Sequence, residues 1–70
     1  MEIMAEWELL FSQQANTDSP TFTAYHVKGE DAVKIVVKTI YPRKQYTMYF
    51  DNEEIEDFYY FIEGVKELTV

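Results

Sequence analysis

The sequence predicts an α+β fold in which a four-stranded antiparallel meander is followed by one C-terminal helix (ββββα). Segments rich in β-branched and aromatic residues recur before residue 50, and short runs of turn-forming residues separate them. The segment 51–68 instead spaces its apolar residues three or four positions apart, which is the period of an amphipathic helix. The chain has 70 residues and no linker-like stretch, so we expect one small domain, residues 1–70.

The strands are predicted from alternation and from the turn formers between them. The first segment alternates only in part, with Trp7, Leu9 and Phe11 on one side, and a short helix is the alternative there. The third segment is the clearest strand, because one of its sides is wholly apolar or β-branched. The expected strands are residues 6–13, 21–27, 32–41 and 46–50, and the expected turns are residues 15–20, 28–31 and 42–45.

The C-terminal helix has a clear start and an ambiguous end. Asp51 is a good N-cap, and Glu54 lies three residues later, where its carboxylate can reach back to form a capping box. Gly64 either is tolerated inside the helix, at a cost of about 1 kcal/mol, or ends the helix early.

The in-phase apolar positions of the strands and the helix predict a core. A chain of this size leaves much surface exposed, and its 12 aromatic residues exceed what one helix on one small sheet can cover. We therefore expect a homodimer that hides the surplus. The predicted core residues are Trp7, Leu9, Phe11, Val33, Ile35, Val37, Met48, Phe50, Ile55, Phe58, Ile62 and Val65.

Charge is distributed unevenly along this acidic chain, whose net charge is −7. Residues 1–18 carry four acids and no base, and residues 28–44 carry five bases against two acids. Residues 51–67 return to a net charge of −6. There is no cysteine, no basic signal-peptide start and no apolar run of membrane-spanning length, so we expect a cytoplasmic protein that does not enter a membrane.

No pattern in the sequence predicts catalysis, a cofactor or a bound metal. His26 is the only histidine and lies within a predicted strand, with no cysteine to activate and no second histidine to share a metal. Asp51, Glu53 and Asp57 lack the interleaved Asn and Gly residues of a calcium loop. We therefore expect a binding protein rather than an enzyme.

Acidic clusters at both ends of the chain favour mimicry of DNA. Carboxylates three or four residues apart on a helix lie roughly 5–6 Å apart, a spacing comparable to that of DNA phosphates. In size, acidity and aromatic content the chain resembles small phage-encoded host-takeover proteins, several of which are DNA mimics. That resemblance implies an inhibitor that binds a protein with a basic DNA-binding surface and does not itself bind nucleic acid. The expected partner-binding residues are Glu6, Glu8, Glu53, Glu56, Asp57, Tyr60, Glu63 and Glu67.

The basic middle of the chain supports a second hypothesis. The expected ββββα order is similar to that of the positive cofactor 4-like family of transcriptional coactivators, whose dimers bind single strands across their sheets. The resemblance implies base stacking and phosphate contacts by Tyr25, Lys34, Lys38, Tyr41, Arg43, Lys44 and Tyr46. A third hypothesis is a hydrophobic protein–protein adaptor that docks a helix or an edge strand on its partner.

Overall fold

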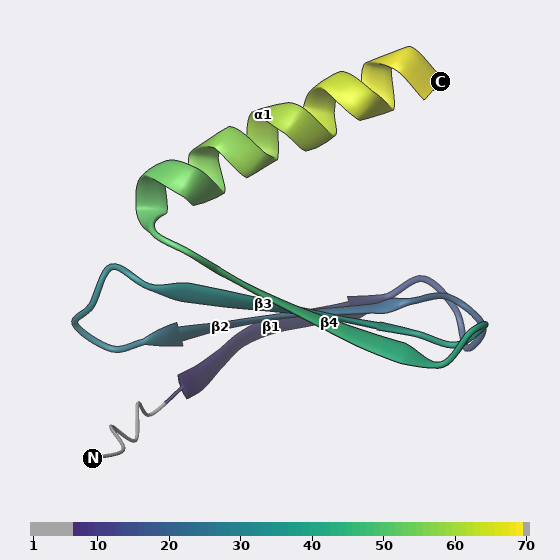
Figure 1. Ribbon diagram of the computed structural model, residues 1–70, viewed down its shortest axis with the longest axis horizontal. Coiled ribbons are helices and arrows are strands. Elements are labelled where there is room, and N and C mark those ends of the chain that lie inside the picture. Colours follow the sequence, from purple (N-terminus) through teal and green to yellow (C-terminus); the bar gives the residue numbers. More distant parts are fainter. Residues whose placement is uncertain (1–6, 70) are drawn as a thin grey trace.

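The computed structural model describes residues 7–69 and confirms the predicted ββββα arrangement. One antiparallel sheet has the spatial order β1-β2-β3-β4, and the helix α1 lies over one side of it (Figure 1). The first segment is a strand and not a helix. The elements are β1 (Trp7–Gln14), β2 (Thr21–Val27), β3 (Val33–Thr39), β4 (Lys44–Phe50) and α1 (Asn52–Thr69).

The turn between β3 and β4 has the predicted length but lies two residues earlier than the sequence predicted, at residues 40–43. Thr39 pairs with Lys44 at the end of the ladder. The Thr39 hydroxyl donates a hydrogen bond to the Pro42 carbonyl and accepts one from the Lys44 backbone N–H, at 3.2 Å. This side-chain bonding closes the hairpin, so β3 ends before Tyr41 and β4 starts at Lys44.

A β-bulge in β1 overturns the predicted alternation of that strand. Leu9 pairs with Tyr25, whereas Phe11 pairs with Ala24, so two residues of β1 advance against one residue of β2. Such an extra residue reverses the faces of all the residues that follow it. Trp7 and Leu9 therefore lie on the face away from the helix, and Phe11 lies on the face toward it.

The start of α1 forms the capping box that the sequence predicts. The Asp51 carboxylate accepts a hydrogen bond from the Glu54 backbone N–H at 2.8 Å, and the Glu54 carboxylate accepts one from the Asp51 N–H at 2.9 Å. Asp31, in the turn between β2 and β3, accepts a further bond from the Asn52 N–H at 2.7 Å. The helix continues through Gly64, so the early end considered for it is excluded.

The helix packs on the sheet only near its own start, which makes part of the predicted core wrong for the single chain. Phe58 stacks on Phe50 with ring centroids 5.4 Å apart, and contacts between α1 and the strands are concentrated on β4. Val36, which was not in the predicted core, is the only buried hydrophobic residue between residues 7 and 69. Five predicted core residues are instead exposed, namely Leu9, Phe11, Met48, Ile62 and Val65.

Candidate functional site

The two faces of the sheet differ in chemistry. We call the face toward α1 the inner face and the opposite face the outer face. Alternation along each strand and the pairing between strands assign the residues to the two faces. The outer face consists of Trp7, Leu9, Ser12, Gln14, Thr21, Thr23, Tyr25, Val27, Lys34, Val36, Lys38, Gln45, Thr47 and Tyr49.

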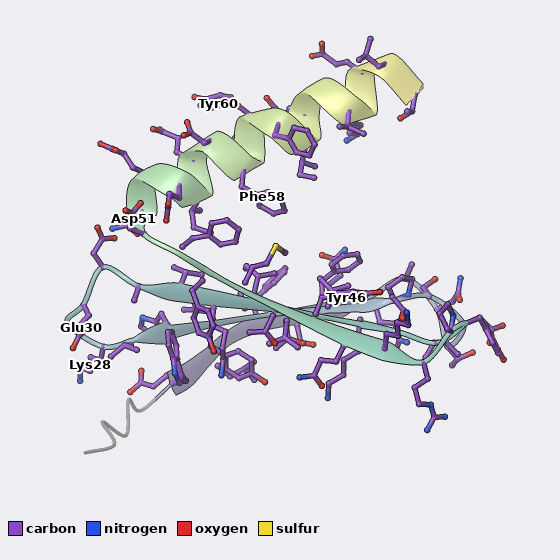
Figure 2. The ribbon with its side chains drawn as sticks, viewed as in Figure 1. Lys28, Glu30, Tyr46, Asp51, Phe58 and Tyr60 are labelled. Carbon is purple, nitrogen blue, oxygen red and sulfur yellow. The ribbon has the colours of Figure 1, made fainter. Side chains whose placement is uncertain are left out.

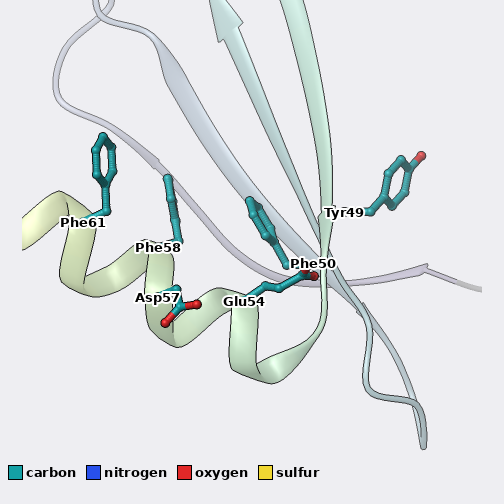
Figure 3. Close-up of a pocket in the computed structure, with 6 residues that line it drawn as sticks. All are labelled: Tyr49, Phe50, Glu54, Asp57, Phe58 and Phe61. Carbon is teal, nitrogen blue, oxygen red and sulfur yellow. The ribbon is translucent and has the colours of Figure 1, made fainter.

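Three aromatic rings surround one lysine on the outer face. The Lys34 ammonium lies 5.0 Å from the centroid of the Trp7 ring and 4.8 Å from that of Tyr25. Tyr49 approaches Trp7 with ring centroids 5.8 Å apart. Tyr49 is 65% exposed and lies on the opposite side of β4 from Phe50 (Figure 3). A cation within about 6 Å of a ring is attracted by its π-electrons, so Lys34 holds this aromatic cluster together.

A basic hollow lies at the hairpin between β3 and β4, where outer-face residues such as Lys38 meet Thr39 and Lys44, which alternation assigns to the inner face. It has a volume of about 470 Å³, and its lining includes the three cationic side chains Lys38, Arg43 and Lys44. Thr21, Thr39, Ile40 and Gln45 complete the lining, which contains no acid. Lys38 follows Lys34 by four residues along β3, which places the two about 13 Å apart. The outer face thus carries the aromatic cluster together with Lys34 and Lys38, and Lys38 also lines the basic hollow.

The structure brings together only some of the residues expected to bind nucleic acid. Tyr25, Lys34 and Lys38 share the outer face, and Arg43 and Lys44 line the adjoining hollow. Tyr46 instead lies on the inner face, on the side of the sheet that carries the helix (Figure 2). Tyr41 is 81% exposed in the hairpin.

Trp7 and Tyr49 belong to the aromatic cluster, and the sequence hypothesis omitted both. The strand pairing opposite Lys34 identifies Tyr49, because Lys34 pairs with Tyr49 on one side and with Tyr25 on the other. No comparable signal identifies Trp7, because its face depends on the bulge that follows it.

The acidic residues expected to bind a protein partner do not form a single array. The helix turns Glu53, Glu56, Glu63 and Glu67 away from its apolar stripe, together with Tyr60, which points away from the sheet (Figure 2). Asp57 lines a hollow between helix and sheet instead. Glu8 lies on the inner face beside His26, with 3.3 Å between its carboxylate and the imidazole Nε2. Glu6 lies outside the described residues.

One of these helix carboxylates has a hydrogen-bonding role. The Tyr59 hydroxyl donates to Glu63 at 2.8 Å, one helical turn away. This hydrogen bond, with the negative charge of Glu63, raises the pKa of Tyr59 above the ordinary tyrosine value.

An apolar groove separates the helix from the inner face. At its narrow end Phe50, Phe58 and Phe61 line a hollow of about 360 Å³, with Glu54 and Asp57 at the rim (Figure 3). Farther along, Phe58 meets the sheet residues Phe11, Phe22, Ala24 and Ile35 around a hollow of about 180 Å³. We call the whole space the helix–sheet groove.

Comparisons with known proteins do not assign this chain to a family: no family model, curated protein or solved structure matches it. Within residues 7–69, no group of three or more His, Asp or Glu side chains is arranged to hold a metal ion. No helix in that range is both long enough and apolar enough to span a membrane. The chemistry of the surfaces is therefore the basis for a functional proposal.

Proposed function

We propose that the outer face of the sheet binds single-stranded nucleic acid. One observation carries this proposal: the outer face combines Lys34, Lys38 and a cluster of aromatic rings and, among residues 7–69, carries no acidic side chain. Proteins that bind single strands without strict sequence preference use this combination of cations that track the backbone and rings that stack on bases.

Different parts of the outer face suit different parts of a nucleic-acid strand, with the rings for the bases and the lysines for the phosphates. Tyr49 offers an exposed ring, and Lys34 lies beside the neighbouring Trp7 and Tyr25 rings. A phosphate that contacts Lys34 therefore lies next to these rings, and the bases adjoining that phosphate in the strand can stack on them. The next phosphates along the strand meet Lys38 and the basic hollow at the hairpin. Each contact of this kind displaces counterions from the nucleic acid, so binding weakens as salt rises.

The net charge of −7 does not prevent this function, because the acids of the helix lie on other surfaces. The outward carboxylates of α1 are separated from the outer face by the helix itself, about 10–12 Å across with its side chains, and by the sheet. Exposed charges this far apart are largely screened at physiological salt, where the Debye length is about 8 Å. The local face, and not the total charge, then governs short-range binding.

Trp7, the only tryptophan in the chain, gives a direct test of the proposal. Titration with a fluorescein-labelled 20-nucleotide oligo-dT at low salt should quench Trp7 fluorescence and raise the anisotropy of the label. Duplex DNA of equal length should bind more weakly, because its bases are already stacked. Unchanged fluorescence and anisotropy at high micromolar protein would refute the proposal.

A matched pair of tyrosines identifies the binding face. Tyr49→Ala should weaken oligo-dT binding about 5- to 150-fold, since stacking on one aromatic side chain contributes about 1–3 kcal/mol. Tyr60→Ala removes an equally exposed ring from the far side of the helix and should leave affinity unchanged. Equal losses in both variants would remove the outer face from consideration.

A second candidate is the inhibition of a host DNA-binding protein by DNA mimicry, as expected of a phage protein. The observation in its favour is that Glu53, Glu56, Glu63 and Glu67 all lie on the solvent side of α1, whose only base is Lys66. An array of carboxylates facing a basic cleft gains from long-range attraction, although each exposed pair contributes only about 0.2–1 kcal/mol.

The two candidate functions and the hydrophobic adaptor predict different effects of salt when proteins are captured from lysate. A basic protein retained from lysate after nuclease treatment should be released by high salt and by Glu56→Gln/Glu67→Gln in the bait. The control Asp18→Asn/Glu30→Gln neutralises two acids elsewhere and should retain it. Capture that is insensitive to salt and to both substitutions would favour the adaptor. Each of these functions operates where nucleic acid and its binding proteins are found, so the cytoplasm is the location we propose.

A further inference from the structure

The single chain has far more surface than a folded protein of its mass requires. Its accessible surface is 6111 Å², whereas a compact monomer of 8.4 kDa has about 4,600 Å². Its radius of gyration is 13.9 Å against about 11 Å for a compact chain of 70 residues. Even half of the excess area, roughly 750 Å², is close to the 800 Å² or so that each partner buries in a typical specific complex.

Part of this surface lies on the two walls of the helix–sheet groove. On the sheet, Phe11 is 62% exposed and Phe22 is 50% exposed. On the helix, Phe61 is 63% exposed and Leu68 is 88% exposed, and Ile62 and Val65 lie between them on the same apolar stripe. Figure 1 shows the cause, since α1 leaves the sheet at its first turn and extends over it as a separate layer. Both walls are therefore apolar and incompletely covered.

We propose that a second copy of this chain fills the groove, with the helix of each copy packed against the inner face of the other. The two uncovered surfaces, a helix stripe and a sheet face, occur once in each chain, so a two-fold axis pairs both of them at the same time. Taken together, Phe11, Phe22, Phe61, Ile62, Val65 and Leu68 expose about 400–700 Å² of apolar side chain. With a polar rim, this area matches one half of a standard interface.

The charge distribution favours this pairing over the other ways of joining two copies. Packing the apolar stripes inside leaves Glu56, Glu63 and Glu67 in solvent on opposite sides of the assembly. Contact between two outer faces would instead bring the Lys34 and Lys38 side chains of both copies together, and like charges that approach closely repel. This dimer leaves both outer faces free, so it can form whatever those faces bind.

Sedimentation equilibrium on the full chain at tens of micromolar tests the proposal directly. The expected mass is twice the 8.4 kDa of one chain, and a mass of one chain would overturn the proposal. Leu68→Glu should raise the dissociation constant of the dimer about a hundredfold or more, because each copy loses a buried leucine and gains a buried charge. Phe61→Glu should act in the same direction. Both side chains are mostly exposed in the single chain, so neither substitution removes a major contact within it.

Tyr60→Glu is the matched control, since it makes the same charge change on the opposite side of the same helix. This variant should remain dimeric, and a monomeric Tyr60→Glu would overturn the assignment of the interface. Persistence of the dimer in both Leu68→Glu and Phe61→Glu would also overturn it. Circular dichroism at 222 nm confirms that each variant keeps its helix.

Mixed isotope labelling distinguishes the proposed dimer, in which each helix packs against the inner face of the other copy, from any other dimer. In a refolded mixture of isotope-labelled and unlabelled chains, filtered NOEs should connect the Ile62 and Val65 methyl groups of one copy to the Phe11 and Phe22 rings of the other. Intermolecular NOEs from Trp7 or Tyr49 instead would show that the outer faces form the interface, and would refute the proposal.

Discussion

Phe58 is a principal contact between the helix and the sheet, and its removal should destabilise the protein strongly. Its ring stacks on Phe50 with centroids 5.4 Å apart and lines both hollows of the helix–sheet groove. Truncating a fully buried Phe costs about 3–5 kcal/mol, and Phe58 is only partly buried in the single chain. We therefore expect Phe58→Ala to lower the free energy of unfolding by about 2–4 kcal/mol.

That loss is large for a chain of this size. At roughly 0.05–0.15 kcal/mol per residue, 70 residues give a total stability of about 4–10 kcal/mol. Urea denaturation followed by Trp7 fluorescence and by circular dichroism at 222 nm measures the change. Both signals should shift to lower urea together, because the sheet and the helix depend on the same contact.

Phe61→Ala is the control for Phe58→Ala, because Phe61 is 63% exposed in the single chain. The effect of Phe61→Ala should depend on protein concentration if the proposed dimer forms, because in that dimer Phe61 contacts the second copy. The loss from Phe58→Ala should remain large at every concentration. An unchanged urea midpoint for Phe58→Ala would show that the helix does not pack on the sheet through this residue.

Three further predictions concern single side chains. Asp51→Ala should lower stability by about 0.5–2 kcal/mol in urea denaturation, because the Glu54 N–H loses its capping partner, whereas Asp18→Ala in the loop after β1 should have little effect. The raised pKa of Tyr59 should appear as a late phenolate transition in ultraviolet absorbance, and Glu63→Ala should return it toward the ordinary value. Because the folded-state pKa is raised, the stabilisation is fully present below the unfolded-state pKa and is lost as pH rises through the folded-state pKa. Lys38→Gln should reduce the slope of log K against log salt for oligo-dT by about 0.7, the contribution of one phosphate contact, and Lys66→Gln on the helix should leave that slope unchanged.

The elements of this fold are predictable from the sequence because their signals are local. The capping box needs only Asp51 and Glu54 three residues apart, and the strands need only alternation between turn formers. The bulge is different, because the run from Leu9 to Phe11 is apolar throughout and fits either register. The pairing with β2 decides it, and that pairing is not visible within β1.

Part of the core was mispredicted because the burial of a helix residue depends on the angle between the helix and the sheet. Periodicity identifies which side of a helix is apolar, but not how far that side lies from the sheet. Here α1 diverges after its first turns, so Ile62 and Val65 stay exposed in the single chain although they are in phase. The outer-face site is predictable only in part. Alternation along β3 places Lys34 and Lys38 on one face, but the face on which Trp7 lies depends on the bulge in β1.

The helix is attached to the sheet at one end only, so a small rotation at the attachment moves its far end. The chain leaves β4 at Asp51, and the bond from Asn52 to Asp31 ties the first turn of α1 to the loop between β2 and β3. With 18 residues the helix is about 27 Å long, so a rotation of one degree at this joint moves its far end by about 0.5 Å. We therefore expect a substitution at Asp31, which lines neither hollow of the groove, to change the angle of the helix and with it the width of the groove.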